Sequence, residues 1–316
     1  MKWYKLLFLL LLIVGTVLII RQQHSMPYQH DEGFIFGTVY SITYQSDDNL
    51  KTDIEAELQK VDGEFSMFNE KSTVARINRG ENVSRSAMFQ EVFELAQTVN
   101  RETDGAFDIT VAPLVNAWGF GFRHEQLPTR HQVDSLLKIR NQYDFAAIAK
   151  GYGSDVVARL LRSRGVKNFM VEIGGEIVTQ GISEKRVPWK IGVTKPTDDS
   201  LSVSGELQTV LNVTDMAMAT SGNYRNFYYK GGKKYAHTID PKTGYPVQHS
   251  LLSATVLAKS CATADAYATS FMVMGVERAK ALLERPPELM AYFIFSHPDG
   301  SNAVWFSPSL KKIIEK

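Results

Sequence analysis

The sequence contains one cysteine, Cys261, among 316 residues. An intramolecular disulfide is therefore impossible, and the stability of the fold must come from its hydrophobic core. A lone cysteine in a run of small residues is typical of buried packing, and no other feature of the sequence marks Cys261 as a nucleophile.

The chain also lacks an excess of charge of either sign. Its 35 Lys and Arg residues balance 34 Asp and Glu residues, which gives a formal net charge of +1. This composition produces no long-range field that attracts nucleic acid, so we expect no nucleic-acid partner. The shares of hydrophobic residues (44%) and charged residues (22%) are those of a globular protein rather than of a disordered or fibrous one.

No internal repeat, low-complexity block or clean interdomain linker interrupts the chain. The G-x-x-x-x-G-K-S/T pattern of a nucleotide-binding P-loop is also absent. Residues 25–316 are therefore expected to form one large domain, whose chemistry must be sought in less common motifs.

Long hydrophobic runs are confined to the N-terminus. Residues 6–20 are apolar without interruption, and Lys2 and Lys5 precede them. Basic residues followed by such a run are typical of an export signal, and no later stretch is long enough to span a bilayer. No small-x-small cleavage site follows, and no cysteine lies there to accept a lipid. We therefore expect residues 1–24 to be an uncleaved signal anchor, with Lys2 and Lys5 on the inner side of the membrane and the remaining domain on the outer side.

Hydrophobic periodicity predicts a mixture of strands and helices. Alternation predicts strands over residues 34–45, 189–194, 206–213 and 253–258, and a strand pair around Gly174-Gly175. Helical spacing predicts helices over residues 50–65, 90–103, 150–164 and 277–284, and one around Asp265. A polar linker is expected over residues 22–31. The last two strands are expected to form a hairpin that turns at Asp299-Gly300. Because strands and helices do not alternate regularly, we expect an α+β fold of mixed, largely antiparallel sheets with packed helices.

The stretch CATADAYATSFMVMG, residues 261–275, places a carboxylate among small apolar residues. In a helix, Asp265 and Thr269 share one face, with the backbone of Ala268 close by. Two hard oxygens on one face suit Mg²⁺, which binds few carboxylates and completes its shell with water and phosphate. The alternative is that Asp265 lies in the first turn of a helix capped by Thr263, where the macrodipole favours an acid. Spacing alone favours the capping interpretation.

Three other stretches combine polar residues with glycine and aromatic residues. TDGAFDITVAPLVNAWGFG, residues 103–121, offers polar groups and ring faces that suit a flat ring system, although a tight structural turn explains it equally well. DFAAIAKGYGSD, residues 144–155, places Lys150 at an expected helix start, where free N–H groups and an ammonium predict an anion site. The third stretch, residues 218–244, contains MATSGNYRNF and HTIDPKTG.

His237 lies in that third stretch, beside a turn. A structural role is the default for such a histidine, yet histidine is also the side chain best suited to accepting a proton near neutral pH. Trp118, Phe120 and Tyr224 are candidates for the walls of a ring-binding site, with core packing as the default for each.

Taken together and in this order, these four stretches, with VEIGGEI after the second, resemble the bacterial flavin transferase family called ApbE. Members of that family move FMN from FAD onto a threonine of a target protein. The resemblance runs from about residue 37 to residue 295, nearly the whole predicted domain, and four motifs in the family's order are far more specific than any one alone.

The resemblance implies a role for individual residues. Asp265, Thr269 and the Ala268 backbone match the family's metal-binding helix, and the carbonyl of Ala147 looks like a further ligand to Mg²⁺. His237 stands at the family's catalytic histidine. The positions that match contacts to FAD are Ala106, Phe107, Asp108, Asp144 and Lys150, together with three that depart from the family's usual residue: Phe36 for Met, Phe68 for a ring-contacting Tyr, and Thr238 for an aliphatic residue. The first two departures keep apolar bulk for ring stacking, and Phe in place of Tyr at position 68 removes a hydroxyl hydrogen bond.

The resemblance therefore implies a Mg²⁺-dependent FAD:protein FMN transferase that releases AMP. Its expected partners are FAD and a target protein with an acceptor threonine, an exported or membrane electron-transfer subunit. Two alternatives remain: a Mg²⁺-dependent FAD pyrophosphatase, in which water replaces the threonine, and a membrane-tethered FAD-binding protein without catalysis.

Overall fold

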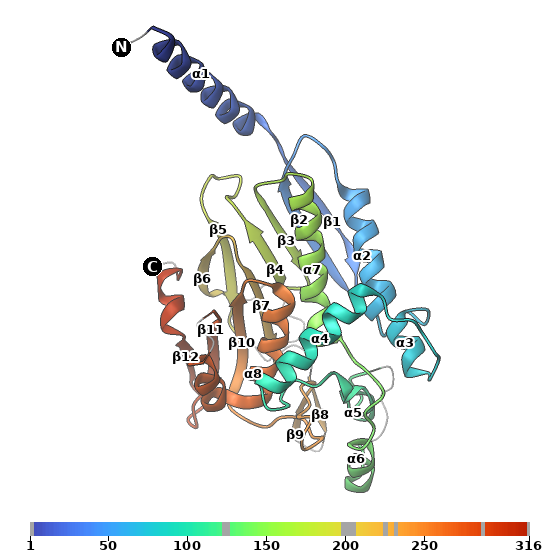
Figure 1. The fold of residues 1–316 in the computed structure, drawn as a ribbon. Helices are drawn as coiled ribbons and strands as arrows, with labels where there is room; N and C mark the ends of the chain where they lie inside the picture. Colours follow the sequence, from blue (N-terminus) through green and yellow to red (C-terminus); the bar gives the residue numbers. More distant parts are fainter. Residues whose placement is uncertain are drawn as a thin grey trace.

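A computed structural model describes residues 3–121, 127–196, 207–223, 227–230, 233–285 and 288–314. Its centre is an eight-stranded sheet in the order β1-β2-β3-β4-β7-β10-β11-β12, in which all neighbouring strands are antiparallel (Figure 1). The strands are β1 (Tyr28–Ile35), β2 (Thr38–Gln45), β3 (Phe169–Ile173), β4 (Glu176–Gln180), β7 (Ala217–Gly222), β10 (Leu251–Ala258), β11 (Met290–Ser296) and β12 (Asn302–Phe306). Two small hairpins accompany them, β5 (Trp189–Thr194) with β6 (Leu207–Val213), and β8 (Phe227–Lys230) with β9 (Lys233–Ala236).

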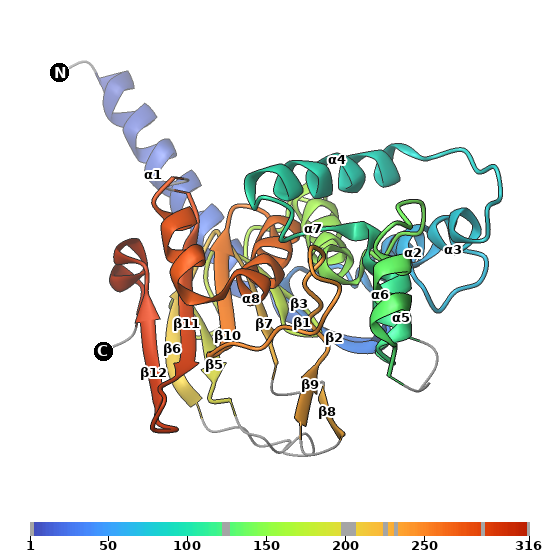
Figure 2. The ribbon, with the colours of Figure 1, turned by 90° about the horizontal axis from the view of Figure 1, so that it is seen from below.

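Helices cover one face of the large sheet, as the view in Figure 2 shows. They are α2 (Lys51–Phe65), α4 (Ala87–Glu102), α7 (Ala146–Ser163) and α8 (Cys261–Leu283). Shorter helical segments are α3 (Thr73–Asn78), η1 (Ile109–Val111), α5 (Ala112–Ala117), α6 (Arg130–Leu136) and η2 (Pro308–Lys312). The helices fold locally because polar side chains cap them: Ser86 accepts from the backbone of Phe89 at α4, and Thr129 and Gln132 form a capping box at α6.

The two faces of the sheet pack into different cores because side chains alternate along each strand. In β7, Ala219 joins a large cluster with helices α4, α7 and α8, whereas its neighbour Met218 joins a cluster with Trp189 and Leu211 from the β5–β6 hairpin. The hairpin thus covers the second face of the central strands. The expected α+β fold with largely antiparallel sheets is confirmed.

Helix α7 approaches α8 very closely at Gly151. A Cβ atom added at Gly151 would lie 2.4 Å from the carbonyl oxygen of Cys261. The carboxylate of Asp155, one turn further along α7, accepts hydrogen bonds of 2.9 Å each from Ser260 Oγ and from the backbone N–H groups of Cys261 and Ala262. An anion on the free N–H groups of a helix start stabilises that end, so α7 fixes where α8 begins.

Several sequence-based boundaries were wrong. The strand expected over residues 34–45 is a hairpin that turns at Phe36 and Gly37, both with positive φ, as the tightest hairpin turns require. Helix α7 begins at Ala146 rather than at Lys150. The break expected between the helix around Asp265 and the helix over residues 277–284 is confirmed, because Gly275 interrupts α8 with a non-helical backbone. The polar linker expected over residues 22–31 shrinks to residues 26–27, between α1 and β1.

Helix α1 (Trp3–Ser25) projects away from the rest of the molecule in Figure 1. Its segment from Trp3 to Arg21 is long and apolar enough to cross a membrane, and none of it is buried against the fold. Length and composition fit a membrane anchor and a signal sequence equally well.

Candidate functional site

A cavity of about 860 Å³ lies between the helical layer and the ends of the central strands. Its volume is in the range of pockets that enclose small-molecule ligands, about 300–1,000 Å³. It brings together twelve of the thirteen residues expected from the sequence: Phe36, Phe68, Ala106, Phe107, Asp108, Asp144, Ala147, Lys150, His237, Thr238, Asp265 and Thr269. The thirteenth, Ala268, is fully buried, and its side chain belongs to the hydrophobic core. Only its backbone is therefore available for the role that the resemblance implies.

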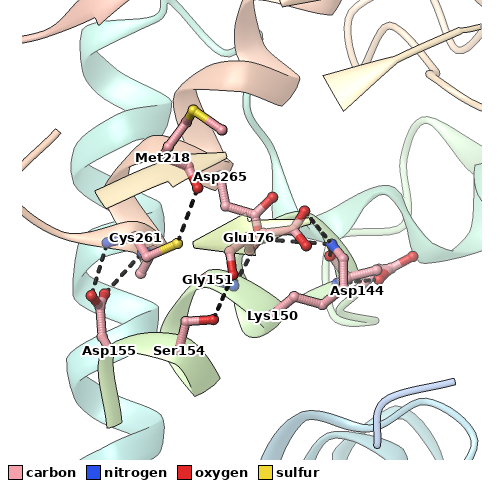
Figure 3. Close-up of polar contacts among 11 residues, drawn as sticks. Asp144, Lys150, Gly151, Ser154, Asp155, Glu176, Met218, Cys261 and Asp265 are labelled. Carbon is pink, nitrogen blue, oxygen red and sulfur yellow. Dashed lines mark hydrogen bonds and ion pairs between the residues drawn. The ribbon is translucent and has the colours of Figure 1, made fainter. Parts of the chain in front are cut away.

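Three charged side chains from three elements form the polar end of the cavity (Figure 3). Lys150 of α7 places its Nζ 3.1 Å from Glu176 Oε1 of β4 and 3.8 Å from Asp265 Oδ2 of α8. The backbone N–H of Gly151 donates to the same Asp265 oxygen at 3.1 Å. Both carboxylates are almost completely buried, whereas 28% of the Lys150 side chain is exposed. The ammonium thus lies between two buried acids, at the edge of the open cavity.

Burial and mutual charge shift the ionisation of these groups. Burial raises the pKa of Asp265, although Lys150 and the N–H of Gly151 oppose the shift. Burial also raises the pKa of Glu176, against the opposing charge of Lys150. Burial alone would lower the pKa of Lys150, but the attraction of Asp265 and Glu176 outweighs it and raises that pKa. The ammonium is therefore charged at neutral pH and is available to an anionic ligand.

The interpretation of Asp265 as a helix-capping acid is wrong. The N-cap of α8 is Ser260, whose hydroxyl accepts from the N–H of Thr263, and the first turn holds no acid. Asp265 follows in the second turn, beyond the free N–H groups that a capping acid would satisfy. Its carboxylate faces the cavity together with Thr269, as expected for positions i and i+4 on one face.

Lys150 also lies elsewhere than expected along its helix. Because α7 begins at Ala146, Lys150 is in the second turn, and its ammonium donates to the carbonyl of Ala146 at 3.3 Å. The first turn is bound by Asp144, whose Oδ1 accepts from the N–H of Ala146 at 2.8 Å. Burial raises the pKa of Asp144, against that hydrogen bond and the charge of Lys150. An anion site here would depend on the ammonium rather than on free helix N–H groups.

Aromatic side chains also line the cavity. Phe36 lies in the β1–β2 turn, and its ring comes so close to α7 that a Cβ at Gly153 would lie 2.7 Å from it. Phe68 is 72% exposed, whereas Phe107 is buried. An exposed phenyl ring beside a cavity offers a stacking surface for a flat ligand.

Asp108 is fixed at the wall of the cavity by its neighbours. Its Oδ1 accepts from the N–H and the hydroxyl of Thr110, at 2.8 and 2.7 Å, and its Oδ2 contacts Arg140 Nη1 at 2.7 Å. The adjoining Phe107 carbonyl accepts from Asn100 Nδ2 at 2.6 Å. The TDGAFDITV stretch is therefore a tightly bonded turn, and it also lines the cavity.

His237 and Thr238 follow β9 and reach the cavity from its far side. His237 is half-buried, with its ring 6.4 Å from that of Phe120, and both line the cavity. Thr238 is buried, and its hydroxyl donates to Asn223 Oδ1 at 2.7 Å. Trp118 instead packs in the core, where its Nε1 donates to the carbonyl of Gly244 at 2.7 Å. The third aromatic candidate, Tyr224, lies outside the described residues.

Two acids of the cavity were missed by the sequence analysis. Glu172 of β3 and Glu176 of β4 flank the Gly174-Gly175 turn and line the cavity. Burial raises the pKa of Glu172. The signal that could have identified them is the pair of acids in VEIGGEI, because an acid in a buried strand requires a partner.

The oxygen donors at Asp265 are few for a metal site. Among the described residues, no group of three or more His, Cys, Asp or Glu side chains lies close enough together to hold an ion. One buried carboxylate and one hydroxyl on the same helical face nevertheless form a hard-oxygen set, and these two groups fit Mg²⁺ because that ion keeps water and phosphate ligands.

Comparison with known proteins identifies the fold and its relatives. The model described as the ApbE family matches residues 36–293. The chain belongs to the ApbE family. It is 36% identical to the FAD:protein FMN transferase of Vibrio cholerae serotype O1 over 100% of this chain and 99% of the relative, and 32% identical to that of Escherichia coli K12 over 90% and 88%. Among solved structures, the flavin transferase ApbE from Vibrio cholerae superposes with a TM-score of 0.80 at 34% identity, covering 91% of this chain and 99% of the other.

Proposed function

We propose that this ApbE family member transfers FMN from FAD to a threonine hydroxyl of a target protein and releases AMP, in a Mg²⁺-dependent reaction. The observation that carries the proposal is the composition of one cavity, which combines an exposed aromatic surface with Lys150, Asp265 and Thr269. A dinucleotide with a flat ring system and a charged pyrophosphate has these two chemical halves. The names of the Vibrio cholerae and Escherichia coli relatives support the same activity.

In this proposal, Asp265 and Thr269 hold the Mg²⁺ ion, with the carbonyls of Ala147 and Ala268 as further ligands. When bound, the ion supplies positive charge to the pyrophosphate and so stabilises the leaving AMP. Lys150 adds a second positive charge on the same side of the cavity. Phe36, Phe68 and the stretch from Ala106 to Asp108 orient the ring systems, so that most of the catalysis is positioning and charge stabilisation.

The covalent step replaces the phosphoanhydride bond of FAD with a phosphate ester of the target threonine. The threonine oxygen attacks the phosphorus of the FMN half, an O–P bond forms, and the bond between that phosphorus and the oxygen of the AMP phosphate breaks. AMP leaves with the electron pair of the broken bond. His237 accepts the proton of the threonine hydroxyl as the attack proceeds, which is the role that histidine performs best near neutral pH.

The proposal includes a location. Residues 1–24 anchor the protein in the bacterial inner membrane, and the catalytic domain faces the periplasm. The apolar, unburied segment from Trp3 to Arg21 supports this, as do Lys2 and Lys5 on its N-terminal side. The target is then an exported or membrane-bound electron-transfer subunit that presents its threonine on the same side.

The test incubates the full chain, in detergent, with FAD and Mg²⁺, with and without a threonine-bearing acceptor domain. AMP release and the mass of the acceptor are followed. We expect the acceptor to gain the mass of FMN minus water. We expect Asp265→Ala to lower the rate by at least about a hundredfold, because a catalytic metal supplies several kcal/mol of charge stabilisation. Asp134→Ala, which removes an exposed acid of α6 outside the cavity, is the matched control and should keep the rate.

Each other outcome corresponds to a different activity. AMP release without a change in acceptor mass would replace the transferase by an FAD pyrophosphatase. Binding of FAD without AMP release would indicate a membrane-tethered flavin-binding protein. A rate that is the same with Asp265→Ala as with Asp134→Ala would remove Asp265 from the reaction.

A further inference from the structure

Glu176 is a buried acid of the cavity to which the proposed reaction assigns no role. Its side chain is 4% exposed, at the start of β4 directly after the Gly174-Gly175 turn. Its Oε1 contacts Lys150 Nζ at 3.1 Å, whereas its Oε2 is buried without a hydrogen-bond partner among the described residues. A buried carboxylate oxygen without a partner is costly, so its retention calls for a physical reason.

Lys150 forms ion pairs with two acids, Glu176 and Asp265, and these acids differ in their other hydrogen-bond partners (Figure 3). Asp265 Oδ2 is held by the backbone N–H of Gly151 at 3.1 Å and is 3.8 Å from the ammonium. Glu176 is closer to the ammonium and has one oxygen still unoccupied. Asp265 is thus fixed by the backbone, while the ammonium can move toward Glu176 and gain a second hydrogen bond there.

A cation bound by Asp265 would meet the ammonium of Lys150 on the same carboxylate. Two like charges at such a distance in a partly buried site repel each other strongly. The repulsion is relieved only if the ammonium moves off Asp265 while keeping a counter-ion, and Glu176 is the acid in position to receive it. Without Glu176, Asp265 is the one acid of the described residues that still forms an ion pair with Lys150, and the ammonium competes with the metal for it.

We propose that Glu176 is a positioning residue: it holds Lys150 away from Asp265, so that a divalent cation and the ammonium occupy the polar end of the cavity together. This inference rests on the proposed assignment of Asp265 as a metal ligand. Glu176 acts through Lys150 and touches neither the metal nor the reacting phosphorus.

The test is a double-mutant cycle on metal affinity, measured on the full chain in detergent. Mn²⁺ is titrated into each protein without FAD, and free Mn²⁺ is followed by its electron paramagnetic resonance signal. The four proteins are the unsubstituted chain, Glu176→Gln, Lys150→Met and the double variant. Glu172→Gln, which removes another carboxylate of the cavity that has no contact with Lys150 among the described residues, is the matched control for the loss of one negative charge.

We expect Glu176→Gln to weaken Mn²⁺ binding roughly 10- to 100-fold, the usual cost of losing a group that orients a metal ligand. Lys150→Met should bind Mn²⁺ at least as tightly as the unsubstituted chain. The double variant should bind Mn²⁺ with the affinity of Lys150→Met, because Glu176 has no ammonium to position once Lys150 is replaced. Glu172→Gln should change the affinity less than about threefold, since a more distant charge acts weakly.

A double variant that binds Mn²⁺ as weakly as Glu176→Gln would overturn the inference, since Glu176 would then act on the metal directly. An affinity of Glu176→Gln equal to that of Glu172→Gln would overturn it as well. If Glu176→Gln does not fold, the Mn²⁺ affinities of Lys150→Met and the double variant still show whether Glu176 acts on the metal only through Lys150. A chain that binds no Mn²⁺ at all would refute the metal assignment itself, which separates the two failures.

Discussion

The close approach of α7 and α8 at Gly151 makes a specific prediction about stability. A Cβ atom at this position would lie 2.4 Å from the carbonyl oxygen of Cys261, 2.7 Å from its carbonyl carbon and 2.9 Å from the backbone nitrogen of Ala262. All three contacts are backbone atoms at the start of α8, where Asp155 holds the chain in place. The clash cannot be relieved by turning a side chain, so Gly151→Ala must move one helix against the other.

The size of the effect follows from two opposing contributions. Alanine in a helix interior is more favourable than glycine by about 1 kcal/mol. Forcing a methyl group into a packed interface costs about 1–3 kcal/mol. Moving α7 also stretches the 3.1 Å hydrogen bond from Gly151 to Asp265, and a hydrogen bond to a charged group contributes about 1.5–3 kcal/mol. We expect Gly151→Ala to lower the free energy of unfolding by about 1.5–5 kcal/mol, the balance of these three.

The matched control is Gly63→Ala, the same substitution in α2. No atom lies within 4 Å of a Cβ at Gly63, so only the helix-propensity gain of about 1 kcal/mol applies, with the opposite sign. Thermal unfolding of the full chain, followed by circular dichroism, measures both, at about 2–4 °C for each kcal/mol in a domain of this size. If Gly151→Ala melts at or above the temperature of Gly63→Ala, the helices are not in contact at Gly151 and the reasoning is refuted.

Two further predictions concern the pH dependence of stability and the distance from the membrane at which a target can be modified. His249 donates from Nε2 to the carbonyl of Met272 at 2.7 Å, and burial lowers its pKa from 6.5. The neutral imidazole therefore stabilises the fold fully above about pH 6.5, and this stabilisation is lost as the pH falls through the lower pKa of the folded state. The difference in melting temperature between the unsubstituted chain and His249→Gln should shrink from pH 7.5 to pH 5.5. A difference that stays constant over this range would contradict the prediction. If residues 1–24 are an anchor, the three residues before β1 and the eight of β1 keep the cavity within about 40 Å of the membrane. An acceptor threonine held further out on a rigid membrane-tethered spacer should then not be flavinylated in vesicles, and equal modification at all spacer lengths would mean that the domain is not tethered.

Local patterns in the sequence predicted the local parts of the site well. Asp265 and Thr269 are four residues apart in one helix, so the helical period alone brings them to one face of the cavity. The Gly174-Gly175 turn and the final hairpin at Asp299-Gly300 follow in the same way from turn residues beside alternating strands. These features depend only on neighbours in the chain, which the sequence displays directly.

Contacts between distant segments were not predicted. Strand β7, with the sequence AMATSG, lies at the centre of the sheet, yet its small residues have little strand preference, and its pairing with β4 and β10 decides its conformation. Glu176 reaches Lys150 only because β4 packs beneath α7, 26 positions away in the chain. The start of α8 was misplaced for the same reason: the carboxylate that holds it, Asp155, belongs to another helix.

The polar end of the cavity is difficult to explain by stability alone. Burying an ammonium and two carboxylates costs several kcal/mol for each ion, and a well-packed apolar trio of similar volume is often as stable or more so. Here the arrangement is also incomplete, because Glu176 Oε2 is buried without a partner among the described residues while Lys150 stays partly exposed to the cavity. A charge cluster made for stability would satisfy its own hydrogen bonds and exclude solvent. One that keeps an ammonium exposed and an acid unsatisfied is suited to accepting a charged ligand, which is why perturbed ionisable groups in a cavity mark functional sites.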